Sequence, residues 1–248
     1  MNKMFYFLFL LFVSIVCAKP DESNNHIFQH NFCESRLQEN RSPEFYNAYS
    51  SLIISIVPFL MNIPKNQIFT NVSFCFMING VASFYYHYYL SWSGKQADEI
   101  IMILCNYFGL CGLIKMNYEN EKNRKLFYFI NMSYMYFFLI INSFIEYDAL
   151  FPHLFFVYLL PTIYLIKCVA KKTKQSYLPN LLCSAFGGFC WVVSENYCNS
   201  FTKFGHVLWH FLFPIGFYRL LLQFDENYKK FPVAKLIKRP SFIPKIDV

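Results

Sequence analysis

The sequence predicts an all-α integral membrane protein, a bundle of seven transmembrane helices that follows a short lumenal N-terminal segment. Three observations support this fold class. Of the 248 residues, 56% are hydrophobic and only 15% are charged, whereas a soluble domain carries about 25% charged residues. The hydrophobic residues form separate runs, and most basic residues lie between alternate runs. The runs occupy nearly the whole length, so no second, soluble domain is expected.

Seven apolar runs are long enough for a tilted membrane helix, which needs about 20 residues. They cover residues 46–63, 68–90, 99–115, 126–145, 150–167, 178–195 and 203–223. Pro58, Pro161 and Pro214 fall inside these runs, where neighbouring helices can satisfy the backbone groups that proline leaves free. We therefore expect one membrane domain over residues 46–223 and a basic tail over residues 224–248.

The basic residues are distributed unevenly between the two sides of this predicted bundle. Most lie in the C-terminal tail and in the loops after the first, third and fifth runs, as Lys65, Arg124 and Lys171 illustrate. Because Lys and Arg next to helix ends stay in the cytosol, the C-terminus is predicted to be cytosolic and the mature N-terminus lumenal. The same bias accounts for the net charge of +7. Without a basic stripe interleaved with aromatic residues outside the membrane, no nucleic-acid partner is expected.

The first eighteen residues have the pattern of a secretory signal peptide. Lys3 precedes an apolar stretch from Phe5 to Val16, and Ala18 ends a cleavage site of small residues. We expect residues 1–18 to be removed and residues 19–45 to emerge as a lumenal segment. An uncleaved anchor is the alternative, and it places the following residues on the same side. Residence in the endoplasmic reticulum or the Golgi apparatus is expected.

Cys33 and Cys198 are the two cysteines that this topology places together on the lumenal side. Of the nine cysteines, five fall inside apolar runs, Cys17 lies in the predicted signal peptide and Cys168 lies at a cytosolic helix end. Because an oxidising compartment permits disulfides, we hypothesise that Cys33 and Cys198 form one.

Polar side chains cluster near the lumenal ends of three predicted helices. Ser83 and His87 are four residues apart in the second run, so they share one helix face. His206 and His210 have the same spacing at the start of the seventh run, and Asp98 immediately precedes the third run. Ionisable residues within membrane segments are costly and tend to be functional. These five residues therefore predict a functional site at one depth.

Three histidines beside a carboxylate fit a zinc ion that keeps its fourth position open for water. Such an ion lowers the pKa of water to about 7, which supplies a nucleophile at neutral pH. A histidine pair at this spacing is by itself also common as a structural hydrogen-bonding feature, and His153, which lacks a paired partner, is interpreted as structural. We expect a metal-dependent hydrolase in which His87, His206 and His210 bind the ion.

Three blocks of this sequence resemble the alkaline ceramidases, and together they extend over most of the mature chain. The blocks are Cys33-Glu34 with Glu44-Phe45-Tyr46-Asn47 and Ser50, then Gly80 to His87 with Asp98-Glu99, and finally Gly205-His206-Val207-Leu208-Trp209-His210. The second and third occur across a superfamily of seven-helix membrane hydrolases that includes progestin and adiponectin receptors and GPI-remodelling phospholipases. The first block is particular to the ceramidases.

This resemblance implies hydrolysis of ceramide to a sphingoid base and a fatty acid. In alkaline ceramidases three histidines bind zinc, an aspartate handles the water proton and a serine assists at the reacting carbonyl. By their positions in the motifs, these roles fall to His87, His206 and His210, to Asp98 and to Ser83. The resemblance also pairs the two lumenal cysteines with each other.

The N-terminal segment departs from the family at its calcium-binding positions. Glu34 and Glu44 remain as candidate ligands, but Asn31 stands where an aspartate is usual and Arg36 where an asparagine is usual. Calcium requires several oxygen ligands, and a guanidinium group beside the site opposes cation binding. Calcium is therefore doubtful as a cofactor.

A second departure lies in the sixth run. Trp191 and Cys198 match the family pattern, whereas Ser194 replaces an acid. The neighbouring Glu195 is the residue that can compensate.

Two other functions stay open on the sequence alone. A GPI- or phospholipid-directed hydrolase of the same superfamily agrees with the signal peptide, although its long cysteine-rich lumenal region is missing here. A zinc-containing seven-helix lipid receptor would hold the metal without turnover. In each case the partners are a lipid and the membrane.

Overall fold

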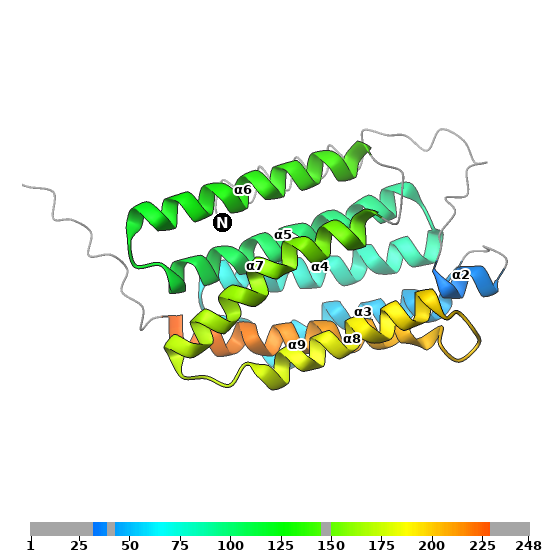
Figure 1. Ribbon diagram of the computed structural model, residues 1–248. Coiled ribbons are helices and arrows are strands. Elements are labelled where there is room, and N and C mark those ends of the chain that lie inside the picture. The colour runs from blue at the N-terminus through cyan, green and yellow to red at the C-terminus, as the bar shows by residue number, and fades with distance from the viewer. Residues whose placement is uncertain (1–31, 39–42, 145–149, 229–248) are drawn as a thin grey trace, which may run out of the picture.

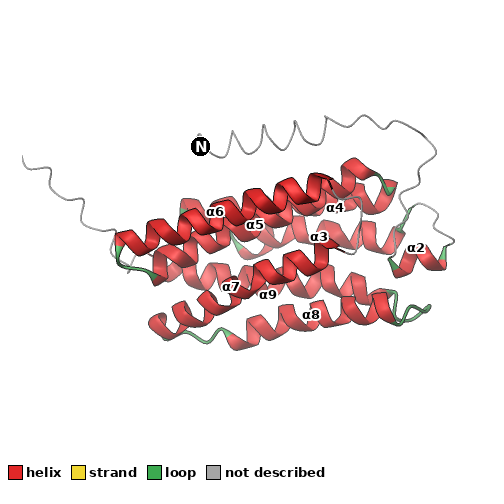
Figure 2. Cartoon of the chain, turned by 45° about the horizontal axis from the view of Figure 1, so that its top comes forward, coloured by secondary structure: helices red, strands yellow, loops and turns green. Residues whose placement is uncertain are grey.

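The computed structural model describes residues 32–38, 43–144 and 150–228, and within these ranges the chain forms eight helices and no strands (Figure 1, Figure 2). The helices are α2 (Cys33–Leu37), α3 (Phe45–Met61), α4 (Gln67–Tyr89), α5 (Trp92–Asn117), α6 (Glu121–Phe144), α7 (Leu150–Thr173), α8 (Leu178–Asn196) and α9 (Phe204–Tyr228). The predicted signal peptide and residues 229–248 of the predicted tail lie outside the described residues.

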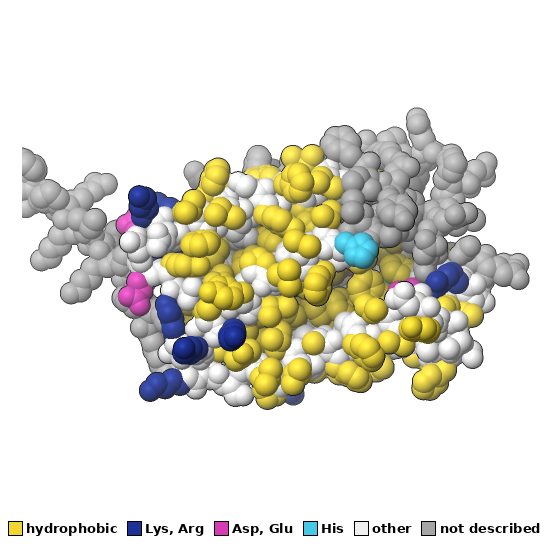
Figure 3. Space-filling view, viewed as in Figure 1, with side chains coloured by type: hydrophobic (Ala, Val, Ile, Leu, Met, Phe, Trp, Pro, Cys, Tyr) yellow, Lys and Arg dark blue, Asp and Glu magenta, His cyan; other side chains and the backbone are white. Residues whose placement is uncertain are grey.

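Several of these helices have the length and composition of membrane spans. Helices α4, α5, α7 and α9 are long and apolar enough to cross a membrane, and α3 is apolar but shorter. Figure 3 shows hydrophobic side chains over the middle of one face and Lys and Arg side chains gathered near one end. These features are those of a multi-pass membrane protein. That all seven long helices cross the membrane stays a prediction, because α3, α6 and α8 are not among these four helices.

The helix bounds correct the predicted ones at four helix ends, one of which is the start of α6 at Glu121, five residues before the predicted residue 126. The third predicted run starts at residue 99, but α5 begins at Trp92, where the Ser91 side chain caps the helix by accepting a hydrogen bond from the Gly94 amide at 3.2 Å. Helix α7 continues past residue 167 to Thr173 and α9 past residue 223 to Tyr228. These helix ends contain charged and polar residues, so a search for apolar runs does not include them. The five-residue helix α2 was not predicted.

Glycines allow the helices to approach closely at two interfaces. A Cβ atom on Gly80 of α4 would lie 2.5 Å from the backbone nitrogen of Ser55 in α3. On α9, Cβ atoms at Gly205 and Gly216 would lie 2.2 Å from the Cys190 carbonyl oxygen and 2.4 Å from the Asn180 carbonyl oxygen of α8. Small residues permit such packing in membranes, where burial against lipid supplies little driving force. The α8 and α9 helices are thereby fixed against each other.

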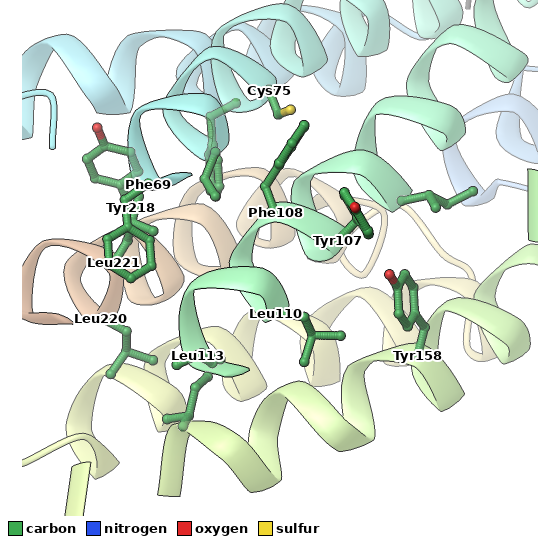
Figure 4. Packing of buried hydrophobic residues seen from close by; sticks show 14 of the residues in the cluster. Phe69, Cys75, Tyr107, Phe108, Leu110, Leu113, Tyr158, Tyr218, Leu220 and Leu221 are labelled. Atoms are coloured by element: carbon green, nitrogen blue, oxygen red, sulfur yellow. The ribbon is translucent and has the colours of Figure 1, made fainter. Parts of the chain in front are cut away.

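The remaining core lies around α5, which contacts α4, α6 and α7. Figure 4 shows part of it, with Tyr107 and Leu113 of α5, Phe69 of α4, Tyr158 of α7 and Tyr218 of α9. These side chains are almost wholly buried. The core holds the long helices in a fixed register, which sets the depth of every side chain that they carry.

The bundle has two chemically different ends (Figure 1). At the first, called the histidine end, lie α2, the α4–α5 turn and the α8–α9 connection. At the second, called the basic end, lie the α5–α6 turn, the α7–α8 connection and the last turn of α9. The last turn of α7 carries Lys171 and Lys172 there, where cations interact favourably with the helix dipole.

Candidate metal centre and catalytic site

Three histidines from two helices meet at the histidine end. His87 lies near the end of α4, and His206 and His210 lie one turn apart at the start of α9. One ring nitrogen from each histidine can serve as a ligand atom, and these three atoms lie within 4.8 Å of one another. The three side chains are buried. The ring centroids are 4.7 to 5.4 Å apart. The structure thus brings together the three histidines that the sequence indicated.

Each of these rings has an oxygen near its Nδ1 atom. His87 Nδ1 lies 2.5 Å from Glu44 Oε2, and His210 Nδ1 lies 2.8 Å from Ser50 Oγ. His206 Nδ1 lies 3.6 Å from Glu195 Oε1, and neither of these two buried atoms has a hydrogen-bond partner. Partners at Nδ1 fix ring orientation and leave Nε2 for a metal. The donor set therefore fits zinc, which accepts three imidazoles and keeps one position open.

Glu44 connects His87 to the N-terminal helix α2. Its Oε1 atom accepts hydrogen bonds from the amide and the hydroxyl of Ser35, and its other oxygen accepts from the Asn47 side chain at 3.3 Å. Burial of this carboxylate opposes its ionisation, but the hydrogen bonds from His87 and Ser35 outweigh burial and lower the pKa of Glu44 to about 2. A fully buried carboxylate is thus kept ionised next to one of the histidines.

Glu34 has a different role, at the start of α3. Its two carboxylate oxygens accept hydrogen bonds from the amides of Tyr46 and Asn47, each at 2.9 Å. These amides belong to the first turn of α3, whose own N-cap residue makes no side-chain cap. Burial raises the pKa of Glu34, while these two amides act in the opposite direction. Both carboxylates proposed as calcium ligands are therefore engaged by protein donors. Asn31 lies outside the described residues.

A disulfide fastens α2 to the α8–α9 connection, because Cys33 and Cys198 are bonded in the structure as predicted. The bond joins residues 165 positions apart in the chain. Next to it, the Cys33 amide donates to Glu195 Oε2 at 2.9 Å and an Arg36 nitrogen donates to the Glu195 carbonyl at 2.6 Å. The short helix thus reaches two of the histidines, His87 through Glu44 and His206 through Glu195.

Glu195, which the sequence offered as a replacement for the missing acid at position 194, lies beside His206 in the structure. Ser194 is fully buried, and its Cβ atom lies in the close α8–α9 contact, 2.9 Å from where a Gly205 Cβ would be. One residue further along α8, the Glu195 carboxylate faces His206 instead.

Asp98 and Ser83 lie beside one another at the same end. The Ser83 hydroxyl donates to the Asp98 carboxylate, and the Asn79 side chain donates to Asp98 Oδ1 at 2.7 Å. Asp98 is buried within the second turn of α5 rather than preceding the helix. Asn79 was not singled out from the sequence, although Asn79, Ser83 and His87 follow one another at four-residue spacing, which places them on one face of α4.

The five predicted site residues line one end of a cavity of about 660 Å³. At this end the lining also includes Arg36, His153 and Glu195. Beyond the site the walls are mostly apolar and come from α4, α5, α7 and α9, as far as Leu221 and Phe224. His153, which the sequence gave no reason to pair, is exposed and contributes to the cavity wall. Figure 3 shows a histidine beside a hollow on the surface.

Fold and site together define a class: a multi-pass helical membrane protein with a buried three-histidine group that could hold a metal ion, open to a long apolar cavity. The sequence model of the ceramidase family matches residues 25–227. The chain therefore belongs to the ceramidase family, as the sequence motifs indicated. A search of the curated proteins found no match. Membership implies a hydrolase with a lipid substrate.

Proposed function

We propose that this protein is a zinc-dependent amidase of the membrane that hydrolyses ceramide to a sphingoid base and a free fatty acid. One observation carries the proposal: the buried histidines, Asp98 and Ser83 all line the same end of a long apolar cavity. An amide with two hydrocarbon chains has this distribution of polar and apolar groups. Family membership supports the same substrate class.

His87, His206 and His210 would hold the zinc ion through their Nε2 atoms. When bound, zinc polarises the scissile carbonyl and lowers the pKa of a water molecule to about 7. Glu44 and Ser50 hold two of the imidazole rings in position by hydrogen bonds at Nδ1, and Glu195 faces Nδ1 of the third, His206, at 3.6 Å. Burial of all three rings excludes bulk water from the site.

Asp98 acts as the general base and then as the general acid. It accepts a proton as the water oxygen attacks the amide carbon, and it returns this proton to the leaving nitrogen as the C–N bond breaks. Asn79 and Ser83 hold its carboxylate in place. Once Asp98 is protonated it is a weaker acceptor, so the Ser83 hydroxyl becomes available to donate to the developing oxyanion.

We further propose that the histidine end faces the lumen of the endoplasmic reticulum or the Golgi apparatus and that the C-terminus is cytosolic. The Cys33–Cys198 disulfide at that end supports this orientation, since disulfides persist in oxidising compartments. In sealed microsomes, we expect a protease to remove a tag at the C-terminus and to leave a tag in the N-terminal segment intact. Protection of the C-terminal tag would instead indicate the opposite topology.

Metal analysis of the detergent-purified protein, combined with lipid hydrolysis assays, tests the proposed activity. The expected result is bound zinc and equal amounts of sphingoid base and fatty acid from ceramide. Fatty acid released from a phospholipid or a GPI lipid instead would identify a different hydrolase of the superfamily. Zinc without release from any lipid would indicate a receptor. Either of these outcomes rejects ceramide hydrolysis.

A further inference from the structure

The apolar cavity continues along α5 well beyond the catalytic residues. From Asp98 onwards its lining residues on this helix include Met102, Cys105, Gly109 and Leu113, which recur every three or four residues and so form one face. With a rise of 1.5 Å per residue, Gly109 lies about 16 Å and Leu113 about 22 Å along the helix from Asp98. One leaflet of a bilayer has a hydrocarbon layer of about 15 Å, half of the full 30 Å. The cavity is therefore deep enough for a complete lipid chain.

Among the lining residues that the structure describes, the deep part of this cavity offers no open polar site for a ligand. Its two polar lining groups bind each other, because Thr162 Oγ1 donates to Asn106 Oδ1 at 2.8 Å and the Asn106 amide nitrogen donates to the Tyr158 carbonyl at 3.1 Å. The surrounding walls are apolar, with Leu113 of α5 and Leu220 and Leu221 of α9 among them (Figure 4). A hydrocarbon chain is the ligand that such walls accept.

Gly109 differs from the other glycines of the chain in what surrounds it. A Cβ atom at Gly109 would meet no atom within 4 Å, whereas one at Gly112, on the same helix, would lie 2.3 Å from the Phe69 ring. Glycine within a helix costs about 1 kcal/mol relative to alanine. No close helix contact explains glycine at position 109, and the space that it leaves open belongs to the cavity.

Resting on the proposed function, we propose that Gly109 determines how long a hydrocarbon chain the cavity accepts. The missing side chain keeps the cavity open between the catalytic end and Leu113. A larger residue at position 109 projects into this space without striking the protein, and it shortens the cavity at about 16 Å from Asp98. Lipids with short chains still fit between the catalytic residues and position 109, while lipids with long chains do not.

The test compares Gly109→Ala, Gly109→Leu and Gly109→Phe with the wild type on two substrate series. One series varies the acyl chain on a fixed sphingoid base, from N-hexanoyl through N-palmitoyl to N-tetracosanoyl ceramide. The other varies the length of the base on a fixed hexanoyl group. We expect the ratio of long-chain to short-chain turnover to fall about tenfold or more for Leu and Phe, and less for Ala, in one of the two series. The series that responds identifies the chain that occupies the deep cavity.

Short-chain turnover by the same variants shows that their site is intact. Val81→Leu is the matched control, because Val81 is exposed on the outer surface of α4, and its chain-length ratio should equal that of the wild type. Unchanged ratios in both series for all three Gly109 variants would overturn the inference while leaving the proposed function standing. An equal loss for all chain lengths in both series, in the Ala variant as well, would also overturn it. If the wild type hydrolyses no ceramide at all, the proposed function fails first.

Discussion

The two ends of the bundle use polar side chains in different ways. At the histidine end four carboxylates are buried, those of Glu34, Glu44, Asp98 and Glu99. At the basic end no described carboxylate is buried, and Asp225 of α9 accepts hydrogen bonds from the amides of Lys65 and Asn66, each at 2.8 Å. The hydrogen bonds of Asp225 serve only to fix the chain just before the start of α4. Buried ionisable groups are expensive in a membrane protein, and their confinement to one end indicates where the chemistry takes place.

The largest expected difference is between removing a histidine at the histidine end and changing a carboxylate at the basic end. We expect His210→Ala to lose zinc and to reduce ceramide hydrolysis to background, because two imidazoles hold zinc too weakly. The matched control is Asp225→Asn at the basic end, which should keep zinc and activity and lower stability by about 1 kcal/mol through the weakened cap. Zinc content and thermal unfolding in detergent measure both. Full zinc in the alanine variant would show that the ion lies elsewhere.

Asp98→Asn should have the next largest effect. The amide keeps the size of the carboxylate and cannot accept the water proton, so turnover should fall by about 10² to 10⁴ while zinc stays bound. Steady-state hydrolysis and metal analysis of the same preparation test this. Normal turnover with zinc in place would remove Asp98 from the role of general base.

Loss of the disulfide should loosen the histidine end as a whole. Cys198→Ser is expected to lower the free energy of unfolding by about 2 to 4 kcal/mol and to weaken zinc binding, because α2 supports Glu44 and Glu195. Cys168→Ser, a free cysteine near the basic end of α7, is the control and should change neither quantity. If the two variants behave alike, α2 does not depend on the disulfide for its position.

Glu195→Ala should have the smallest effect of the four. Supporting residues of metal ligands contribute about 10- to 100-fold to metal affinity or activity, and Glu195 faces only one of the three histidines. Competition with a zinc chelator measures the change in affinity, and Glu195→Gln should recover part of it by accepting a hydrogen bond from His206. An affinity equal to that of the wild type in both variants would assign Glu195 to the attachment of α2 alone.

The sequence predicted the features that depend on local spacing. The four-residue separations of Ser83 from His87 and of His206 from His210 set their helix faces, and apolar runs located each of the seven long helices. The disulfide followed from topology, because only two cysteines remained on the predicted lumenal side. Each of these inferences needed no knowledge of how distant segments pack.

The features that the sequence did not predict depend on packing or on helix ends. The start of α5 at Trp92 was missed because its capped first turns contain Lys95, Asp98 and Glu99, which break the apolar run. The support of His210 by Ser50 requires the register of α3 against α9. The proximity of Glu195 to His206 depends on how α8 packs against α9, and no pattern within a single helix reveals such a contact.

The order of the site residues along the chain has a consequence for synthesis. His87 and Asp98 are joined by the short α4–α5 turn, so they can be positioned as soon as that hairpin is in the membrane. Cys198, His206 and His210 belong to about the last seventh of the predicted membrane domain as it leaves the ribosome. A nascent chain that stops before α9 contains only one of the three proposed imidazole ligands, His87. Formation of the proposed zinc site therefore requires α9, and a product truncated before α9 lacks two of the three ligands even though it already contains both cysteines of the disulfide.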